Sequence, residues 1–239
     1  QLMSSSGQSE HLLKFTETTM NLVHELQIER GMSAGFIGSQ GTQFASELQQ
    51  HRKKTDNRLN SFVQFVKSDE FKNMSTDVSG TNTILADLDK LTQIRSSTDS
   101  LNTDGSLVIT YFNTTIRQLI HKPLQMLPLL NDTYLLQDLT AVFTFSQIKE
   151  RGGIQRAVFS NILSSKSLSK KNARLMYTLV AEEDSYRDAA NSLILPKFAN
   201  RLKSFEKGAS NQDVEKLRTQ IIEDANENRF EINASRWFE

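Results

Sequence analysis

Hydrophobic residues recur along most of this chain at steps of three and four, which is the spacing of an amphipathic helix. In the first segment, Leu12, Phe15 and Leu22 fall on one stripe with Leu26. Similar stripes predict further helices over residues 44–66, 84–100, 107–121, 135–148, 168–205 and 211–239. No alternating run is long enough to build a sheet. We therefore expect an all-α chain of roughly six to eight helices packed as bundles.

Few residues interrupt these stripes. We expect Pro123 and Pro128 to break the chain after the fourth stripe, and Pro196 to kink or break the long sixth one. Residues 131–133, Asn-Asp-Thr, have the composition of a helix N-cap. Residues 208–212 are predicted to form a loop before the last helix.

The composition excludes several classes of function. The 239 residues contain no cysteine, so disulfide scaffolds, thiol nucleophiles and thiolate metal sites are ruled out. Lys and Arg number 28, as do Asp and Glu, and this balance argues against a nucleic-acid partner. The four histidines lack metal-ligand spacing, and the motifs of P-loop and hydrolase enzymes are absent. We expect no metal, no cofactor and no enzymatic activity.

The sequence itself holds no membrane span, since no stretch reaches the roughly 18 consecutive apolar residues that a span needs. The chain begins at Gln1 rather than at a methionine, so we expect it to be a segment of a longer protein. Near its other end, Trp237 and Phe238 either face a membrane surface or pack in the ordinary way. The sequence leaves both alternatives open.

Six of the ten glycines fall into two short windows, residues 31–41 and 152–153. Glycine inside a helix costs about 0.5–1 kcal/mol relative to alanine, so another interaction must offset that cost. Two explanations need no ligand: the glycines let helices pack closely, or Gly38 and Gly41 end the first helix. The third explanation is that a ligand approaches the backbone at these windows.

Each glycine window also holds an arginine at a position where the hydrophobic stripe predicts burial, Arg30 in the first and Arg156 in the second. Arginine is rarely buried without a partner. Either each guanidinium forms an internal ion pair, with Glu29 or Glu150 as counter-charge, or the two guanidiniums converge on an anion. A planar oxyanion matches the fork of arginine donors.

The same two windows resemble the paired signatures of a known family. Residues 27–39 read Gln-Ile-Glu-Arg-Gly-Met-Ser-Ala-Gly-Phe-Ile-Gly-Ser, and residues 149–157 read Lys-Glu-Arg-Gly-Gly-Ile-Gln-Arg-Ala. In order and separation they are similar to the signatures of the nitrate- and nitrite-sensing (NIT) domain family. The resemblance covers about residues 12–205.

The resemblance implies a single sensing domain over residues 1–239, built from long antiparallel helices packed as two side-by-side bundles. It also implies that Arg30 and Arg156 contact a nitrate or nitrite ligand. Two further residues of the first signature, Gln27 and Ser33, are secondary candidates for polar contacts.

The second signature contains a further cation, Arg151, to which the resemblance assigns no role. Arg151 either pairs with Glu150 or alters the anion preference of the site.

Members of the family serve as input modules of bacterial chemoreceptors, sensor kinases, cyclases and transcription antiterminators. In the receptors the domain lies between two membrane helices. The resemblance therefore implies a periplasmic, extracytoplasmic sensor of an inner-membrane chemotaxis receptor, attached to the membrane through flanking helices outside this chain, and it allows a homodimer. Two other functions stay open: a helical interaction or scaffold module without a small ligand, and a sensor of an amino acid or another organic anion.

Overall fold

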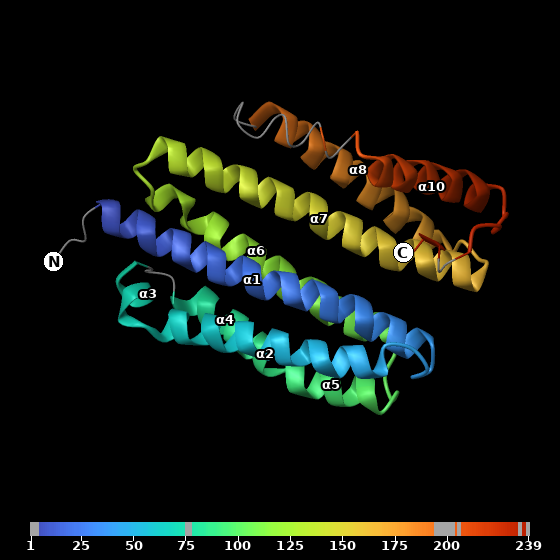
Figure 1. The fold of residues 1–239 in the computed structure, drawn as a ribbon, viewed down its shortest axis with the longest axis horizontal. Helices are drawn as coiled ribbons and strands as arrows, with labels where there is room; N and C mark the ends of the chain where they lie inside the picture. The colour runs from blue at the N-terminus through green and yellow to red at the C-terminus, as the bar shows by residue number, and fades with distance from the viewer. Residues whose placement is uncertain (1–4, 75–77, 194–203, 205–206, 234–235, 238–239) are drawn as a thin grey trace. The chain divides into compact units, whose positions relative to one another are not determined.

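The structure is a computed structural model that describes residues 5–74, 78–193, 204, 207–233 and 236–237. Within these ranges the regular elements are all helices, which confirms the all-α prediction. None of the described helices is both long and apolar enough to cross a membrane. The chain divides into two compact helical units, Gln1–Leu136 and Gln137–Glu239 (Figure 1). That they act as a single domain stays a prediction.

The first unit is an up-and-down bundle. Its elements are α1 (Ser5–Gly38), α2 (Ala45–Lys67), α3 (Asp69–Met74), α4 (Val78–Asp89), α5 (Leu91–Asp99), α6 (Gly105–Met126) and the short 3-10 helix η1 (Leu127–Leu129). Within the unit α1 packs along α2 and α6. The helices α4 and α5 follow one another in a single row that packs on α6 (Figure 1).

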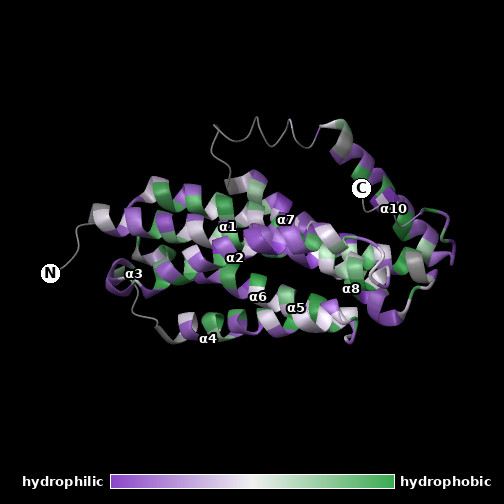
Figure 2. Cartoon of the chain, turned by 60° about the horizontal axis from the view of Figure 1, so that its bottom comes forward, coloured by the Kyte–Doolittle hydropathy of each residue, from purple (hydrophilic) through white to green (hydrophobic). Residues whose placement is uncertain are grey.

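The core of the first unit contains a cluster of aromatic rings. Phe15 of α1 stacks on Phe62 and Phe65 of α2, with ring centroids 6.2 and 6.0 Å apart, and tilts against Phe71 of α3 at 5.0 Å. Burying one such ring contributes about 1.5–3 kcal/mol. The stripes read from the sequence supply these residues, and Figure 2 shows hydrophobic (green) and hydrophilic (purple) residues alternating along the helices.

The first helix ends at Gly38 in a Schellman motif, so for Gly38 and Gly41 the structure shows the helix-end alternative. Gln40 and Gly41 take positive φ angles of 52° and 80°. The Gly41 N–H donates to the Phe36 carbonyl at 2.8 Å, and the Gln40 N–H donates to the Ile37 carbonyl at 3.0 Å. A left-handed backbone at Gly41 costs little because glycine has no Cβ.

The end of α6 differs from the prediction, because Pro123 lies inside the helix and not at its end. A proline removes one backbone donor, but only the last turn of α6 follows Pro123. Both Pro123 and Met126 are buried, and that packing holds the last turn. The break comes after Met126, where the chain enters η1 with its Pro128.

The second unit contains most of α7 (Thr133–Ser165), together with α8 (Lys170–Leu193) and α10 (Ala209–Asn226). The N-cap predicted at residues 131–133 is confirmed. The Asp132 carboxylate accepts from the N–H groups of Tyr134 and Leu135, at 2.9 and 3.1 Å. A capped start of this kind is worth about 1 kcal/mol.

The core of the second unit joins α7, α8 and α10 to Trp237. Phe159, Met176 and Ile221 come from α7, α8 and α10. The ring of Trp237 stacks on Phe159 with centroids 5.1 Å apart, and Trp237 is only 8% exposed. Of the two alternatives for Trp237, packing is therefore the one that the structure shows. Phe238 lies outside the described residues.

The last helix departs from the prediction at both ends. α10 begins at Ala209, so only Gly208 of the predicted loop stays outside the helix. It stops at Asn226 because Asn228 takes a left-handed φ of 56° and the Arg229 N–H returns to the Asp224 carbonyl at 2.7 Å. The predicted kink at Pro196 lies outside the described residues.

Candidate functional site

The first signature lies on α1, where the helix is enclosed on more than one face. Glu29, Arg30 and Ser33 are 0%, 4% and 2% exposed, and Gln27 is half-buried. Consecutive residues of a helix point about 100° apart, so burial of both Glu29 and Arg30 requires neighbours on two sides. The burial predicted for Arg30 is confirmed.

Arg30 bonds to the helix that runs beside it. Its Nη1 donates to Oδ1 of Asn113 on α6 at 2.6 Å. The acceptor is a neutral amide oxygen, so this bond fixes the guanidinium without cancelling its charge. The sequence analysis did not single out Asn113, because a lone asparagine on a helix carries no distinguishing pattern.

Glu29 has a different partner. Arg95 of α5 donates to both oxygens of Glu29, from Nε at 2.7 Å and from Nη2 at 2.9 Å. The remaining arm of Arg95, Nη1, reaches Asp56 of α2 at 2.6 Å. One arginine thereby ties α1, α2 and α5 together with charge-assisted bonds.

Arg52 of α2 extends this ion network. Its Nε lies 3.7 Å from Glu29, and its Nη1 donates to Asp99 at 2.8 Å. Glu29 is thus engaged by two cations other than its neighbour, which weakens the explanation that Glu29 is the counter-charge of Arg30. Arg95 continues the stripe of Leu88 and Leu91, so the extension that found Arg30 would also have found Arg95.

Charge and burial act together on the groups around this network. Burial alone disfavours the charged form of Arg95, but the bonds from Glu29 and Asp56 outweigh it and raise the pKa of Arg95 above its usual value. Burial also raises the pKa of the nearby Tyr111 to about 12. The Tyr111 hydroxyl donates to the Asp87 carbonyl at 2.9 Å. At neutral pH Arg95 therefore stays charged and Tyr111 keeps its proton.

The second signature lies on α7 and buries different residues. Glu150 and Gln155 are 3% and 2% exposed, whereas Arg156 is exposed. The burial predicted for Arg156 is therefore wrong. Gln155 stands one helical turn before Phe159 and takes the inward position, so its neighbour Arg156 is turned about 100° outward. The Nε2 of Gln155 donates to the Leu179 carbonyl of α8 at 3.2 Å.

Arg151 is held by α8. Its Nε donates to Glu182 at 2.9 Å, an Nη1 bond reaches Gln147, and the guanidinium lies 4.9 Å from the centre of the Tyr186 ring. The described ionic partner of Arg151 is therefore Glu182 and not the Glu150 suggested by the sequence.

The glycines divide into two kinds. A Cβ at Gly35 would come within 2.5 Å of the Phe44 ring, so Gly35 is required by close packing. A Cβ at Gly31 or Gly152, by contrast, would meet no atom within 4 Å. Close packing between helices therefore does not explain the glycine that follows Arg30 or the one that follows Arg151.

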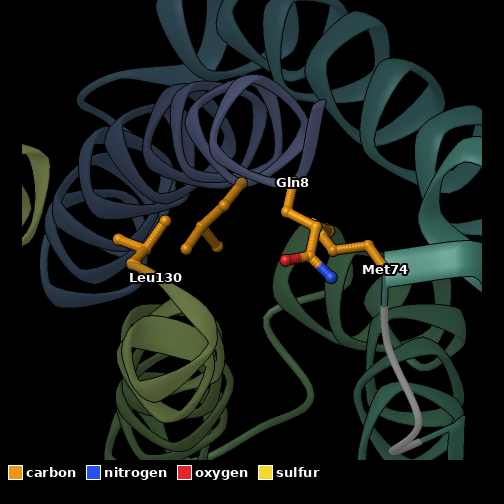
Figure 3. A pocket seen from close by; sticks show the side chains of 4 residues that line it. Gln8, Met74 and Leu130 are labelled. Atoms are coloured by element: carbon orange, nitrogen blue, oxygen red, sulfur yellow. The ribbon is translucent and has the colours of Figure 1, made fainter. Parts of the chain in front are cut away.

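One enclosed cavity of the first unit is too small for an anion. It measures about 10 Å³ and is lined by Gln8, Leu12, Met74 and Leu130 (Figure 3). Such a volume holds about one water molecule. In the part of the chain that the structure describes, no cluster of three or more His, Asp or Glu residues is placed to hold a metal ion.

The sequence matches a model of the nitrate and nitrite sensing family over residues 21–239. The chain belongs to this family. The resemblance drawn from residues 27–39 and 149–157 is thereby confirmed, and NIT membership supports a sensing role. None of the curated proteins compared with the chain is similar enough to count as a match.

A solved structure, that of the NasR transcription antiterminator, is similar to this NIT chain. The TM-score is 0.82 at 21% sequence identity, and the match covers 98% of this chain and 64% of the other. At this identity the likeness shows the fold alone. The chain therefore corresponds to a part of the NasR structure and not to its whole length.

The four predicted contact residues of the NIT chain fall into both units. Gln27, Arg30 and Ser33 lie on α1 in the first unit, and Arg156 lies on α7 in the second. That Arg30 and Arg156 contact one anion together stays a prediction.

Proposed function

We propose that this NIT chain binds nitrate or nitrite at Arg30 and signals that binding. The observation that carries the proposal is the state of the Arg30 guanidinium. It is buried, and it is fixed by the neutral oxygen of Asn113, while the adjacent Glu29 is engaged by Arg95. A fixed cation in a low-dielectric setting attracts an anion more strongly than an exposed one does.

The neighbours of Arg30 suit a planar oxyanion. A guanidinium offers two parallel donors, which match two oxygens of nitrate or nitrite. Gln27 and Ser33 stand three residues to either side of Arg30 on α1, so all three share one helical face and can add an amide and a hydroxyl donor. The absence of a side chain at Gly31 leaves room for the ligand beside them.

The second half of the proposal concerns Arg156. Two guanidiniums close together are unfavourable without an anion between them. If Arg30 and Arg156 share the ligand, the anion favours the arrangement in which they are close and shifts the population toward it. A small displacement of α1 against α7 is the signal that we propose.

The setting that we propose is an extracytoplasmic sensor in a membrane receptor, anchored by flanking helices outside the chain and free to pair with a second copy. The likeness to the NasR antiterminator favours a second setting, in which the same kind of helix displacement controls an antiterminator. Both settings use the same ligand chemistry.

Isothermal titration of the 239-residue chain with nitrate, nitrite and chloride tests the ligand. We expect heat with nitrate or nitrite and much less with chloride. Arg30→Ala and Arg156→Ala should each weaken binding by about tenfold or more, because each removes a charged hydrogen-bond donor. Arg58→Ala, which removes an exposed arginine of α2, is the matched control and should bind like the wild type.

The alternatives give different results. A scaffold module gives no heat with any anion, and loss of either arginine then affects stability only. A sensor of organic anions gives heat with amino acids or organic acids but not with nitrate or nitrite. Full affinity in both arginine variants would place the nitrate site elsewhere.

A further inference from the structure

A buried carboxylate of α8, that of Glu183, contacts the second signature although it belongs to neither signature itself. Glu183 is 5% exposed. Its Oε2 accepts a hydrogen bond from Nε2 of Gln155 on α7 at 2.5 Å. The same Nε2 donates to the Leu179 carbonyl at 3.2 Å. A side-chain amide has two N–H donors, so both donors of Gln155 are directed at α8.

Glu183 is in turn held by cations of α8 and α10. Its Oε1 accepts from Nε and Nη2 of Arg187 at 3.0 and 2.6 Å, and Arg187 stands one helical turn later on α8. Nη1 of Arg218 on α10 lies 3.6 Å from Oε2 of Glu183. Hydrogen bonds between charged groups are shorter and stronger than those between neutral groups. The acceptor that receives Gln155 is therefore itself fixed by two helices.

A second bond between α7 and α8 lies one turn earlier. Nε of Arg151 donates to Glu182 at 2.9 Å, and Glu182 directly precedes Glu183. Arg151 and Gln155 are four residues apart, so they lie on the same edge of α7 and both face α8. Two bonds on successive turns set the rotation of α7 about its own axis relative to α8.

This rotation determines the direction of Arg156. Arg156 follows Gln155 and points about 100° away from the edge of α7 that faces α8. Gly152 stands one turn before Arg156 on the same face, and a Cβ at Gly152 would meet no atom within 4 Å. A rotation of α7 by one residue would instead turn Arg156 toward α8.

We propose that Glu183 is a positioning residue for the second NIT signature. Through Gln155 it holds α7 in the rotation that places Arg156 and the open space at Gly152 on one face. Glu183 does not touch the anion, and it acts on binding through the direction of Arg156. The inference rests on the proposed nitrate function of Arg156, but the position of this turn can be measured without nitrate.

Trp237 reports the position of the turn in the absence of a ligand. It is the one tryptophan of the sequence, and its indole N–H donates to the Arg156 carbonyl at 3.1 Å. Gln155→Leu keeps a buried side chain of similar size but removes the bonds to α8. We expect its tryptophan emission to shift to longer wavelength, because the turn moves and water reaches the indole. The matched control is Tyr177→Phe, which removes the hydrogen bond from Tyr177 of α8 to Asn226 of α10 and should leave the emission unchanged.

Glu183→Gln tests the same link from the α8 side. It keeps the size of the side chain and removes the charge, and its emission should shift in the same direction as that of Gln155→Leu. Circular dichroism of each variant shows that the helices are retained.

Nitrate titration tests the consequence for binding. Gln155→Leu should weaken nitrate binding about fivefold in the wild-type chain, but no further in a chain that already carries Arg156→Ala. A general loss of structure would weaken binding by the same factor in both chains. This double-mutant cycle therefore separates positioning of Arg156 from ordinary packing.

The outcomes distinguish this inference from the proposed function. A shift of the emission without any nitrate heat in the wild-type chain supports the positioning of the turn and removes the nitrate function. The inference is overturned if the emission is unchanged in both Gln155→Leu and Glu183→Gln. It is also overturned if nitrate binds and Gln155→Leu has the wild-type affinity, or if its loss of affinity is the same with and without Arg156.

Discussion

The two NIT signatures place their charged residues differently. In the first signature Glu29 and Arg30 are both buried, and each has its own partner on a neighbouring helix. In the second, Glu150 is buried but Arg156 is exposed. The difference teaches that an arginine within a family signature is not enclosed merely because a hydrophobic stripe passes through its position. The first arginine is enclosed and bonded to Asn113 on α6, whereas the second lies at the surface of α7.

Among the changes considered, removal of the Glu29 charge should have the largest effect on the stability of the fold. Glu29→Gln leaves Arg95 and Arg52 buried without their shared carboxylate, and we expect a loss of about 3–5 kcal/mol in the free energy of unfolding. Urea unfolding followed by circular dichroism measures it. The matched change in the second signature region is Glu182→Gln, which frees the more exposed Arg151 and should cost about 1 kcal/mol or less. Equal losses in both variants would contradict the comparison.

Alanine substitutions at the glycines should change the free energy of unfolding in opposite directions in the same urea assay. Gly35→Ala places a methyl group against the Phe44 ring and should cost about 1–3 kcal/mol. Gly31→Ala and Gly152→Ala meet open space and should stabilise their helices by about 0.5–1 kcal/mol.

Nitrate titration of the stabilised glycine variants sharpens the comparison further. If the gap beside Arg30 serves the ligand, Gly31→Ala gains stability but loses nitrate affinity. Unchanged affinity in Gly31→Ala would show that the ligand does not use this space.

Asn113 provides the test that bears most directly on the first arginine. Asn113→Asp keeps the shape of the side chain but adds a carboxylate that neutralises Arg30, so nitrate affinity should fall about tenfold or more. Titration calorimetry measures it, and a melting temperature close to that of the wild type serves as the control. Nitrate affinity at the wild-type level in Asn113→Asp would remove Arg30 from the site.

The smallest expected effect is the change in stability at high pH that comes from the titration of Tyr111. Because the pKa of Tyr111 is raised to about 12, the folded chain favours the protonated phenol. The resulting stability is present below pH 10 and is lost as the pH rises from about 10 to 12. Tyr111→Phe should remove this part of the pH dependence. In Glu29→Gln the phenol should titrate at lower pH, because one negative neighbour is gone, and absorbance of the phenolate at about 295 nm records it.

The sequence sufficed for much of the fold because its stripes and caps are local. The helix end at Gly38, the cap at Asp132 and the burial of Arg30 follow from neighbours within a turn or two. The burial of Arg156 was predicted wrongly because Gln155 and Arg156 each lie three or four residues before Phe159, so helical spacing alone does not choose between them. The contact of Gln155 with α8 decides which of the two is buried. The end of α6 was misplaced because the packing of Pro123 depends on residues distant in sequence.

In the candidate site, too, the local pattern was predictable from the sequence and the contacts with distant residues were not. The signatures identified the family, but the partners that set the electrostatics, Asn113 and Arg95, come from helices without a signature. A hydrophobic stripe indicates that a polar residue on the same face is buried, but it does not identify the residues of other helices that contact it.

Trp237 has a mechanical consequence for the second signature. Its indole N–H donates to the backbone carbonyl of Arg156 at 3.1 Å, across 81 residues of sequence, while its ring lies on Phe159. The tail of the chain is thus fastened to the turn of α7 that carries the second arginine. A ligand that pulls on this turn also pulls on the tail, and a force applied to the tail reaches Arg156 by the same link.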